Sequence, residues 1–201
     1  MQTEQGNRCI LTIIDVFTKY TVAVPMPNQL AVTVAEAFLH QWILRFGAPR
    51  RLLTDRGVNF ESATISNLCS VWRIDKVRTT AYHPAGNGAC ERVNQTSKKG
   101  LAKVLNQRQL DKWDLALPHV LFAYNTSVHT ATGFTPQFLM MGSEARVPSE
   151  VQIGIPPAEL SSSSFAYNRY KKLELAYESA RENLTTRQRR TKDYYDLGAT
   201  R

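Results

Sequence analysis

The sequence is poor in cysteine and histidine, and it has no long apolar run. Its three cysteines, Cys9, Cys69 and Cys90, form no close pair, and they show no ligand-like spacing with the four histidines. These absences exclude a disulfide framework and a zinc module built from cysteines and histidines. No apolar stretch is long enough to cross a membrane, and residues 1–6 lack the apolar segment of a signal peptide. We therefore expect free thiols in a reducing compartment, either the cytosol or the nucleus.

Acidic residues are also scarce relative to basic ones. Across 201 residues, 25 lysines and arginines oppose 17 aspartates and glutamates, which gives a net charge of +8 and an isoelectric point near 9.6. This balance favours a polyanionic partner such as a nucleic acid, although many soluble proteins are basic too. With 43% hydrophobic residues, the chain is long enough to bury the core of one domain and to carry an appendage.

Apolar periodicity divides most of the chain into strands and helices. Runs of β-branched residues bounded by turn residues predict strands at 9–16, 20–26, 51–55 and 76–80. Apolar residues at helical spacing predict helices at 33–46, 62–72, 91–105, 112–126 and 135–141. This order is typical of an α/β domain, and we assign residues 1–147 to it.

The last part of the chain differs in composition. Residues 148–164 contain two adjacent prolines and a run of four serines, which predicts a linker. Residues 165–201 carry nine Lys/Arg against five Asp/Glu and an apolar stripe at helical spacing, which predicts a basic amphipathic helical extension. The pattern is typical of a solvated helix with an apolar stripe, and it also fits an arm that packs on another protomer or a basic helix that faces DNA. The stripe consists of Tyr170, Leu173, Tyr177, Ala180 and Leu184.

Two carboxylates, Asp55 and Glu91, lie where a metal site would be expected. Asp55 ends an apolar strand just before a loop, and Glu91 opens a helix after a loop rich in proline and glycine. Carboxylates in such positions hold divalent metal ions for phosphodiester chemistry. Taken singly, Asp55 is typical of a turn residue, and Glu91 of a first-turn charge that suits the helix dipole. Together, their positions favour a metal site.

Several motifs, in order along the chain, resemble one known family. The runs at 53–60 (LTDRGVNF) and 82–94 (YHPAGNGACERVN) are similar to the integrase catalytic core of retroviruses and gypsy-type LTR retroelements. Gly6-Asn7-Arg8 with Ile13-Ile14-Asp15 resembles the hairpin of that family, and the stretches 121–125 and 132–136 resemble its later helical region. The resemblance covers roughly residues 6–142. Because several motifs agree in order, it is far more specific than a single match.

The resemblance implies a fold, an activity and a metal. The fold would be a ribonuclease-H-like α/β mixed sheet flanked by helices, here lacking its first central strand and followed by the amphipathic helix. The activity would be DNA integration, through 3′-end processing and strand transfer by a polynucleotidyl transferase. Asp55 and Glu91 would be the second and third members of an Asp-Asp-Glu triad that holds Mg²⁺ or Mn²⁺.

The resemblance also implies a DNA surface and partners. The residues expected to contact or approach DNA are Tyr82, Asn94, Lys98, Lys99, Asn59 and Asn87. The lysines would neutralise phosphates without reading sequence, although without the resemblance a solvated helix end would be the preferred interpretation of Lys98 and Lys99. The expected partners are element ends, target DNA and further copies of the chain. The expected location is the nucleus, after a cytoplasmic phase.

The first member of the triad has no counterpart in the sequence. The family places it on a strand upstream of the residues that match Gly6-Asn7, where residues 1–5 contain no aspartate. Asp15 matches a residue beside the following turn instead, so we expect it to hydrogen-bond the turn backbone. We therefore expect impaired catalysis. The main alternative is a non-catalytic or domesticated remnant that binds DNA or other integrase chains, and a ribonuclease-H-type nuclease fits the flanks of Asp55 and Glu91 less well.

Overall fold

The chain forms two compact units, each with its own packed core. The residues that the computed structural model describes are 2–79, 88–146 and 162–198. The first unit comprises Met1–Ile14 and Thr21–Phe122, and the second comprises Asp15–Tyr20 and Ala123–Arg201. The predicted linker at 148–164 lies mostly outside the described residues.

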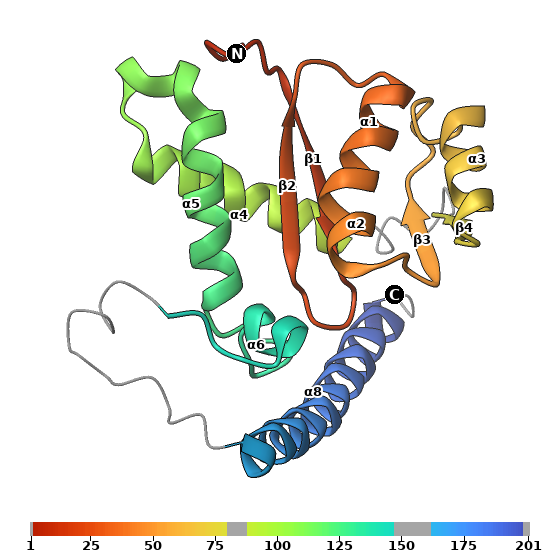
Figure 1. Ribbon diagram of the computed structural model, residues 1–201, viewed down its shortest axis with the longest axis vertical. Coiled ribbons are helices and arrows are strands. Elements are labelled where there is room, and N and C mark those ends of the chain that lie inside the picture. The colour runs from red at the N-terminus through yellow and green to blue at the C-terminus, as the bar shows by residue number, and fades with distance from the viewer. Residues whose placement is uncertain (1, 80–87, 147–161, 199–201) are drawn as a thin grey trace. The chain divides into compact units, whose positions relative to one another are not determined.

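Every strand and helix predicted from periodicity has a counterpart in the structure (Figure 1). In chain order the elements are β1 (Cys9–Ile14), β2 (Thr21–Met26), α1 (Ala31–Phe38), η1 (Leu39–Ile43), α2 (Leu44–Phe46), β3 (Arg51–Thr54), α3 (Ala63–Val71), β4 (Asp75–Arg78), α4 (Gly88–Val104), η3 (Gln107–Lys112), α5 (Trp113–Thr126), α6 (Pro136–Met141) and α8 (Ser162–Gly198). No helix among the described residues is both long and apolar enough to cross a membrane.

The sheet of the first unit is split into two ladders of two strands. β1 and β2 pair as an antiparallel hairpin, and β3 and β4 pair in parallel, with α3 as the crossover between them. Among the described residues, β1 and β3 each have a strand partner on one side only. This split agrees with the expectation that a ribonuclease-H-like sheet here lacks its central strand.

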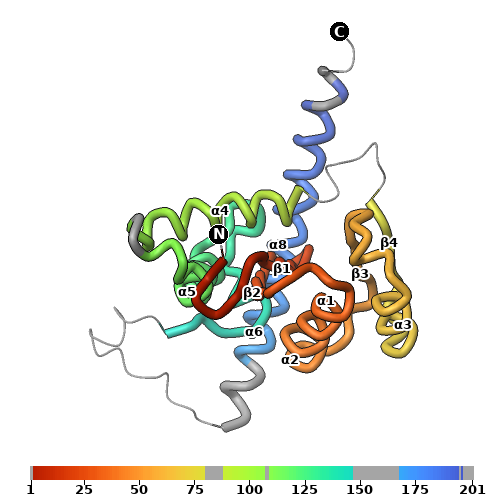
Figure 2. Tube along the Cα trace, turned by 90° about the horizontal axis from the view of Figure 1, so that it is seen from above, coloured from red at the N-terminus to blue at the C-terminus, as the bar shows by residue number. Residues whose placement is uncertain are grey.

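Helices cover both faces of the hairpin. α1 and α4 each contact β1, and Figure 2 shows the hairpin lying between them. Ile10 and Ala23 pack against a buried cluster on α4 and α5, formed by Leu101, Ala116, Leu117 and Leu121. Because neighbouring residues of a strand point to opposite faces, the buried Leu11 lies on the other side of the sheet, toward α1.

The helix predicted at 33–46 is a single helical segment interrupted by a π turn. α1, η1 and α2 follow one another without a break, and the π turn η1 carries the buried side chains of Trp42 and Ile43. A π turn takes one extra residue into a helical turn, so it shifts which residues face the core. Regular 3.6-residue periodicity does not anticipate such a shift. The segment ends at Gly47, whose φ of 87° is the left-handed backbone that glycine tolerates best.

α8 completes the core of the second unit. Its buried residues Ala176 and Ala180 pack in one cluster with Phe138 and Leu139 of α6. Phe17, from the turn between β1 and β2, lies against this cluster. The middle of the predicted apolar stripe is therefore covered by the same chain, and over this stretch α8 is neither a solvated helix nor an arm for another protomer.

Candidate metal centre and nucleic-acid surface

Asp55 lies at the carboxyl end of β3, as predicted. The parallel pairing with β4 continues one step past the strand, because Thr79 N–H donates to the Thr54 carbonyl over 3.0 Å. Asp55 is exposed, and its Oδ1 accepts a hydrogen bond of 2.9 Å from Gly57 N–H. This bond fixes the carboxylate over the loop that follows the strand, with its second oxygen Oδ2 left for another partner.

Asn59 lies beside Asp55 at a tight turn around Gly57. A Cβ placed on Gly57 would lie 2.6 Å from Asn59 Oδ1 and 3.0 Å from Asp55 Oδ1. The carboxamide and carboxylate oxygens thus converge on a space that only glycine leaves open. Oxygen donors of this kind are the ligands that Mg²⁺ and Mn²⁺ prefer. The residues present therefore fit a hard divalent cation.

Glu91 lies in the first turn of α4 and is exposed. The partial positive charge of the helix N-terminus stabilises a carboxylate there. The neighbouring Cys90 thiol responds to the charges around the start of α4. Burial raises the pKa of the Cys90 thiol, and the negative charges of Asp55 and Glu91 raise it further. The two carboxylates, which are distant in sequence, therefore act on one thiol.

No third carboxylate completes this pair within the described part of the chain. No group of three His, Cys, Asp or Glu side chains there is arranged to hold a metal ion. Asp15 has the turn role predicted for it, because its Oδ2 accepts hydrogen bonds of 2.7 Å from both Thr18 N–H and the Thr18 hydroxyl.

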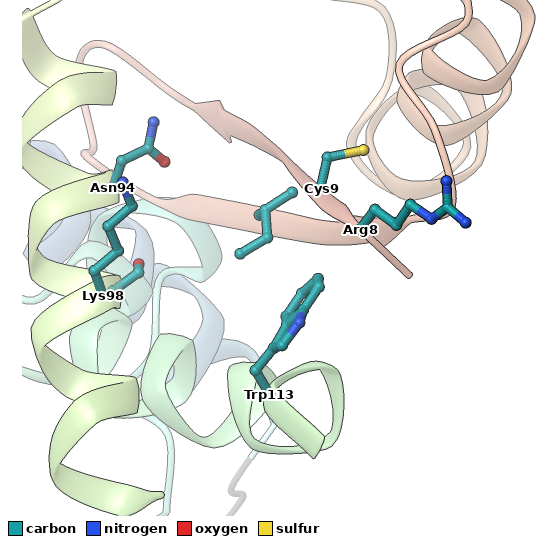
Figure 3. Close-up of a pocket in the computed structure, with 7 residues that line it drawn as sticks. Arg8, Cys9, Asn94, Lys98 and Trp113 are labelled. Atoms are coloured by element: carbon teal, nitrogen blue, oxygen red, sulfur yellow. The ribbon is translucent and has the colours of Figure 1, made fainter. Parts of the chain in front are cut away.

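Asn94 and Lys98, two of the predicted DNA contacts, line a pocket of about 300 Å³ between α4 and β1 (Figure 3). The Thr12 hydroxyl of β1 hydrogen-bonds Asn94 Oδ1 over 2.6 Å, which fixes the amide at the pocket wall. The full lining is Arg8, Cys9, Ile10, Asn94, Ser97, Lys98 and Trp113. Lys99 is exposed on α4 but does not line this pocket, and Tyr82 and Asn87 lie outside the described residues.

Sequence reasoning did not single out Arg56, Arg8 or Trp113. Arg56 Nε donates to the Thr79 carbonyl over 3.3 Å, which ties the Asp55 loop to the end of β4. Its position directly after Asp55 was the available signal, but the contact depends on the parallel pairing of two distant strands. Arg8 and Trp113 join the pocket from separate elements, and no local pattern in the sequence marks them.

Comparison with known proteins relates this chain to integrases. The family model described as "Integrase core domain" matches residues 1–84. A retrovirus-related Pol polyprotein from transposon 412 of Drosophila melanogaster is 29% identical over 198 residues, which is 98% of this chain and 16% of that protein. The Gag-Pol polyprotein of Koala retrovirus is 32% identical over 158 residues, which is 78% of this chain and 8% of that protein. Residues 1–84 of this chain thus match the integrase core family, and most of its length is similar to Pol polyproteins of a retrotransposon and a retrovirus.

Solved integrase cores share its fold. The catalytic core domain of BIV integrase superposes with a TM-score of 0.55 at 27% identity, covering 66% of this chain and 84% of that one. The HTLV-2 integrase catalytic core domain, solved with magnesium in a trimeric form, gives a TM-score of 0.56 at 23% identity, covering 70% and 89%. The fold is therefore ribonuclease-H-like. The chain spans less than a fifth of the length of the two polyproteins above.

Proposed function

We propose that this chain is the catalytic core of an LTR-retroelement integrase, whose intact parent processes DNA 3′ ends and transfers the strands to target DNA, and that its own catalysis is impaired. The observation that carries the proposal is the placement of Asp55 directly after β3 and of Glu91 in the first turn of α4, with both negative charges acting on the Cys90 thiol. A pair of carboxylates so placed suits phosphodiester chemistry assisted by divalent metal.

Asp55 and Glu91 would hold Mg²⁺ or Mn²⁺, with the Asn59 carboxamide as a neighbouring oxygen donor. Such an ion, when bound, activates a water or a DNA 3′-hydroxyl and stabilises the leaving oxygen. Within the protein, Gly57 N–H holds one oxygen of Asp55, and Glu91 lies in the first turn of α4. The contact with Gly57 thus orients the Asp55 carboxylate before a metal arrives.

The pocket beside α4 would receive the DNA end. Lys98 supplies a positive charge for a phosphate, and Asn94 supplies an amide that Thr12 already orients. Lys99, Tyr82 and Asn87 would extend this surface. The DNA partners would be element ends and target DNA, the working form would be a homo-oligomer, and the site of action would be the nucleus after a cytoplasmic phase.

Strand transfer with Mn²⁺ tests the proposal on the full chain. The assay joins an oligonucleotide duplex with a free 3′-hydroxyl to plasmid DNA, and we expect Asp55→Asn or Glu91→Gln to abolish the product. Asp75→Asn is the matched control. It removes the same charge from an exposed position at the opposite end of the β3–β4 ladder.

A parallel thermal-shift titration separates the enzyme from a non-catalytic remnant. Metal that binds only the folded state at a hundredfold excess over Kd stabilises it by about 2.7 kcal/mol. If Mn²⁺ stabilises the chain in a way that depends on Asp55 but no strand transfer occurs, the non-catalytic remnant is favoured. The two carboxylates would then bind metal without supporting strand transfer. Strand transfer that survives Asp55→Asn would refute the assigned site.

A further inference from the structure

α8 carries a basic run, residues 187–192, near its C-terminal end. The six residues 187–192 include Arg187, Arg189, Arg190 and Lys192 and contain no acid. All six residues are exposed. We propose that this basic run binds the phosphate backbone of duplex DNA. The inference rests on the proposed function, because it names a further surface by which an integrase core would hold its DNA.

The helix that presents the basic run is anchored to its own unit up to the first residue of the run. Hydrogen bonds from α8 side chains to the backbone and side chains around α6 recur along its length. They run from Arg169 Nε to the Gly142 carbonyl (2.9 Å), from the Tyr177 hydroxyl to the Leu139 carbonyl (2.7 Å), from Asn183 Nδ2 to the Thr132 carbonyl (2.9 Å) and from Arg187 Nη1 to the Thr130 hydroxyl (3.0 Å). The helix continues past the last of these contacts, and Figure 2 shows it extending well beyond α6. The cations are therefore held on a supported helix.

The basic run concentrates four cations in a short length of helix. With a rise of about 1.5 Å per residue, Arg187 and Lys192 lie about 7.5 Å apart along the axis. Duplex DNA carries about one phosphate charge per 3.4 Å of its axis on each strand. At about 3.6 residues per turn, Arg189 and Lys192 share one side of the helix, and Arg187 and Arg190 share another. A helix lying between the two strands would thus present cations to the phosphates of both.

The ordinary alternative is a solvated helix face whose charges are neutralised locally. The nearest acids on the helix, Asp193 and Asp196, lie four residues after Arg189 and Lys192. This order, with the cation first, is the weaker one for a helical ion pair. Among the described residues, the ion pairs seen within 4.0 Å do not include Arg187, Arg189, Arg190 or Lys192.

The test measures DNA affinity by fluorescence anisotropy, using the full chain, a short labelled duplex and EDTA in place of metal. In such a measurement, the logarithm of the affinity falls linearly with the logarithm of the salt concentration. If the basic run neutralises four phosphates, it should contribute about −3.6 to the slope of this line. Arg189→Gln with Arg190→Gln should reduce this slope by about 1.8 between 50 and 200 mM KCl. The two substitutions spare Arg187, which contacts Thr130, and glutamine is a good helix former.

Arg45→Gln with Arg50→Gln is the matched control, because it removes two exposed cations from the first unit. We expect this control to leave the slope nearly unchanged. An equal change in both double variants would overturn the proposal, since it would show a general effect of net charge. No change in the Arg189/Arg190 variant would also overturn it, as expected if the run served an acidic protein partner instead.

The same measurement separates this inference from the proposed function. Asp55→Asn should abolish strand transfer and leave the salt slope in EDTA as it is, because that slope needs no metal. If strand transfer fails but the basic run still sets the slope, the inference stands while the catalytic assignment falls. If strand transfer depends on Asp55 but the slope is insensitive to Arg189 and Arg190, only the inference falls.

Discussion

Replacing Gly100 with alanine tests how closely α4 and α5 pack. A Cβ at Gly100 would lie 2.5 Å from Val120 Cγ1 and 3.4 Å from Val120 Cγ2. Val120 is stiff at χ1, and it packs against the buried cluster formed by Leu101 and its neighbours. A rotation of the Val120 side chain about χ1 would therefore bring its other methyl group toward the new Cβ. The added methyl group must push the two helices apart.

The expected size of the effect follows from two opposing terms. Alanine in a helix is favoured over glycine by about 1 kcal/mol. An extra methyl in a well-packed core costs about 1–3 kcal/mol, and the short approach to a stiff side chain places Gly100→Ala in the upper part of this range. The net loss in the free energy of unfolding should be about 1–2 kcal/mol. For a chain of this size, that lowers Tm by about 2–8 °C.

Urea or thermal unfolding of four proteins checks this reasoning: the wild type, Gly100→Ala, Val120→Ala and the double variant. Because Val120→Ala removes the methyl groups that the new Cβ meets, the double variant should be more stable than the sum of the two single effects by about 1 kcal/mol or more. A Gly100→Ala variant that melts above the wild type would refute the close approach, since helix propensity alone would then decide.

Two further predictions concern the site and the N-terminal turn. Gly57→Ala should weaken Mn²⁺ binding, measured by calorimetry, about tenfold or more, because the new methyl displaces the oxygens of Asp55 and Asn59; unchanged affinity would contradict their role as ligands. Burial raises the pKa of Asp114, but hydrogen bonds, chiefly from Asn7 Nδ2 at 2.8 Å, outweigh it and leave the pKa below its ordinary value. The stability that this carboxylate contributes is thus complete above about pH 5 and is lost as the pH falls through and below about 3.9. Asp114→Asn should therefore lower Tm clearly at pH 7 and less at pH 3, and an equal loss at both would refute the shift.

Local chemistry made much of this fold predictable from sequence. The end of β3 and the start of α4 follow from an apolar run that stops at Asp55 and from the breakers that precede Gly88. The turn role of Asp15 follows in the same way, because an aspartate hydrogen-bonds backbone and hydroxyl groups a few residues ahead of it. Each of these features is decided by residues close together in the chain.

Features that depend on distant residues were not predictable. The apolar stripe of α8 marks a buried face, but it does not say that α6 of the same chain covers Ala176 and Ala180. The pocket beside Asn94 takes Arg8 and Trp113 from elements far apart in sequence. The same holds for the effect of the Asp55 charge on Cys90, which requires the strand and the helix to be assembled first.

The contact between Phe17 and Tyr177 sets an order on folding during synthesis. Their rings lie edge to face with centroids 5.2 Å apart, although Tyr177 follows Phe17 by 160 residues. Once the ribosome has synthesised the chain as far as Phe122, all residues of the first unit are present, so its β1–β2 hairpin can form. The turn of that hairpin, residues 15–20, cannot make its contacts with α8 until α8 has been synthesised. Contacts of such long sequence separation form late and slowly. Until then the apolar tip of the hairpin is a surface on which a nascent chain can aggregate or a chaperone can bind.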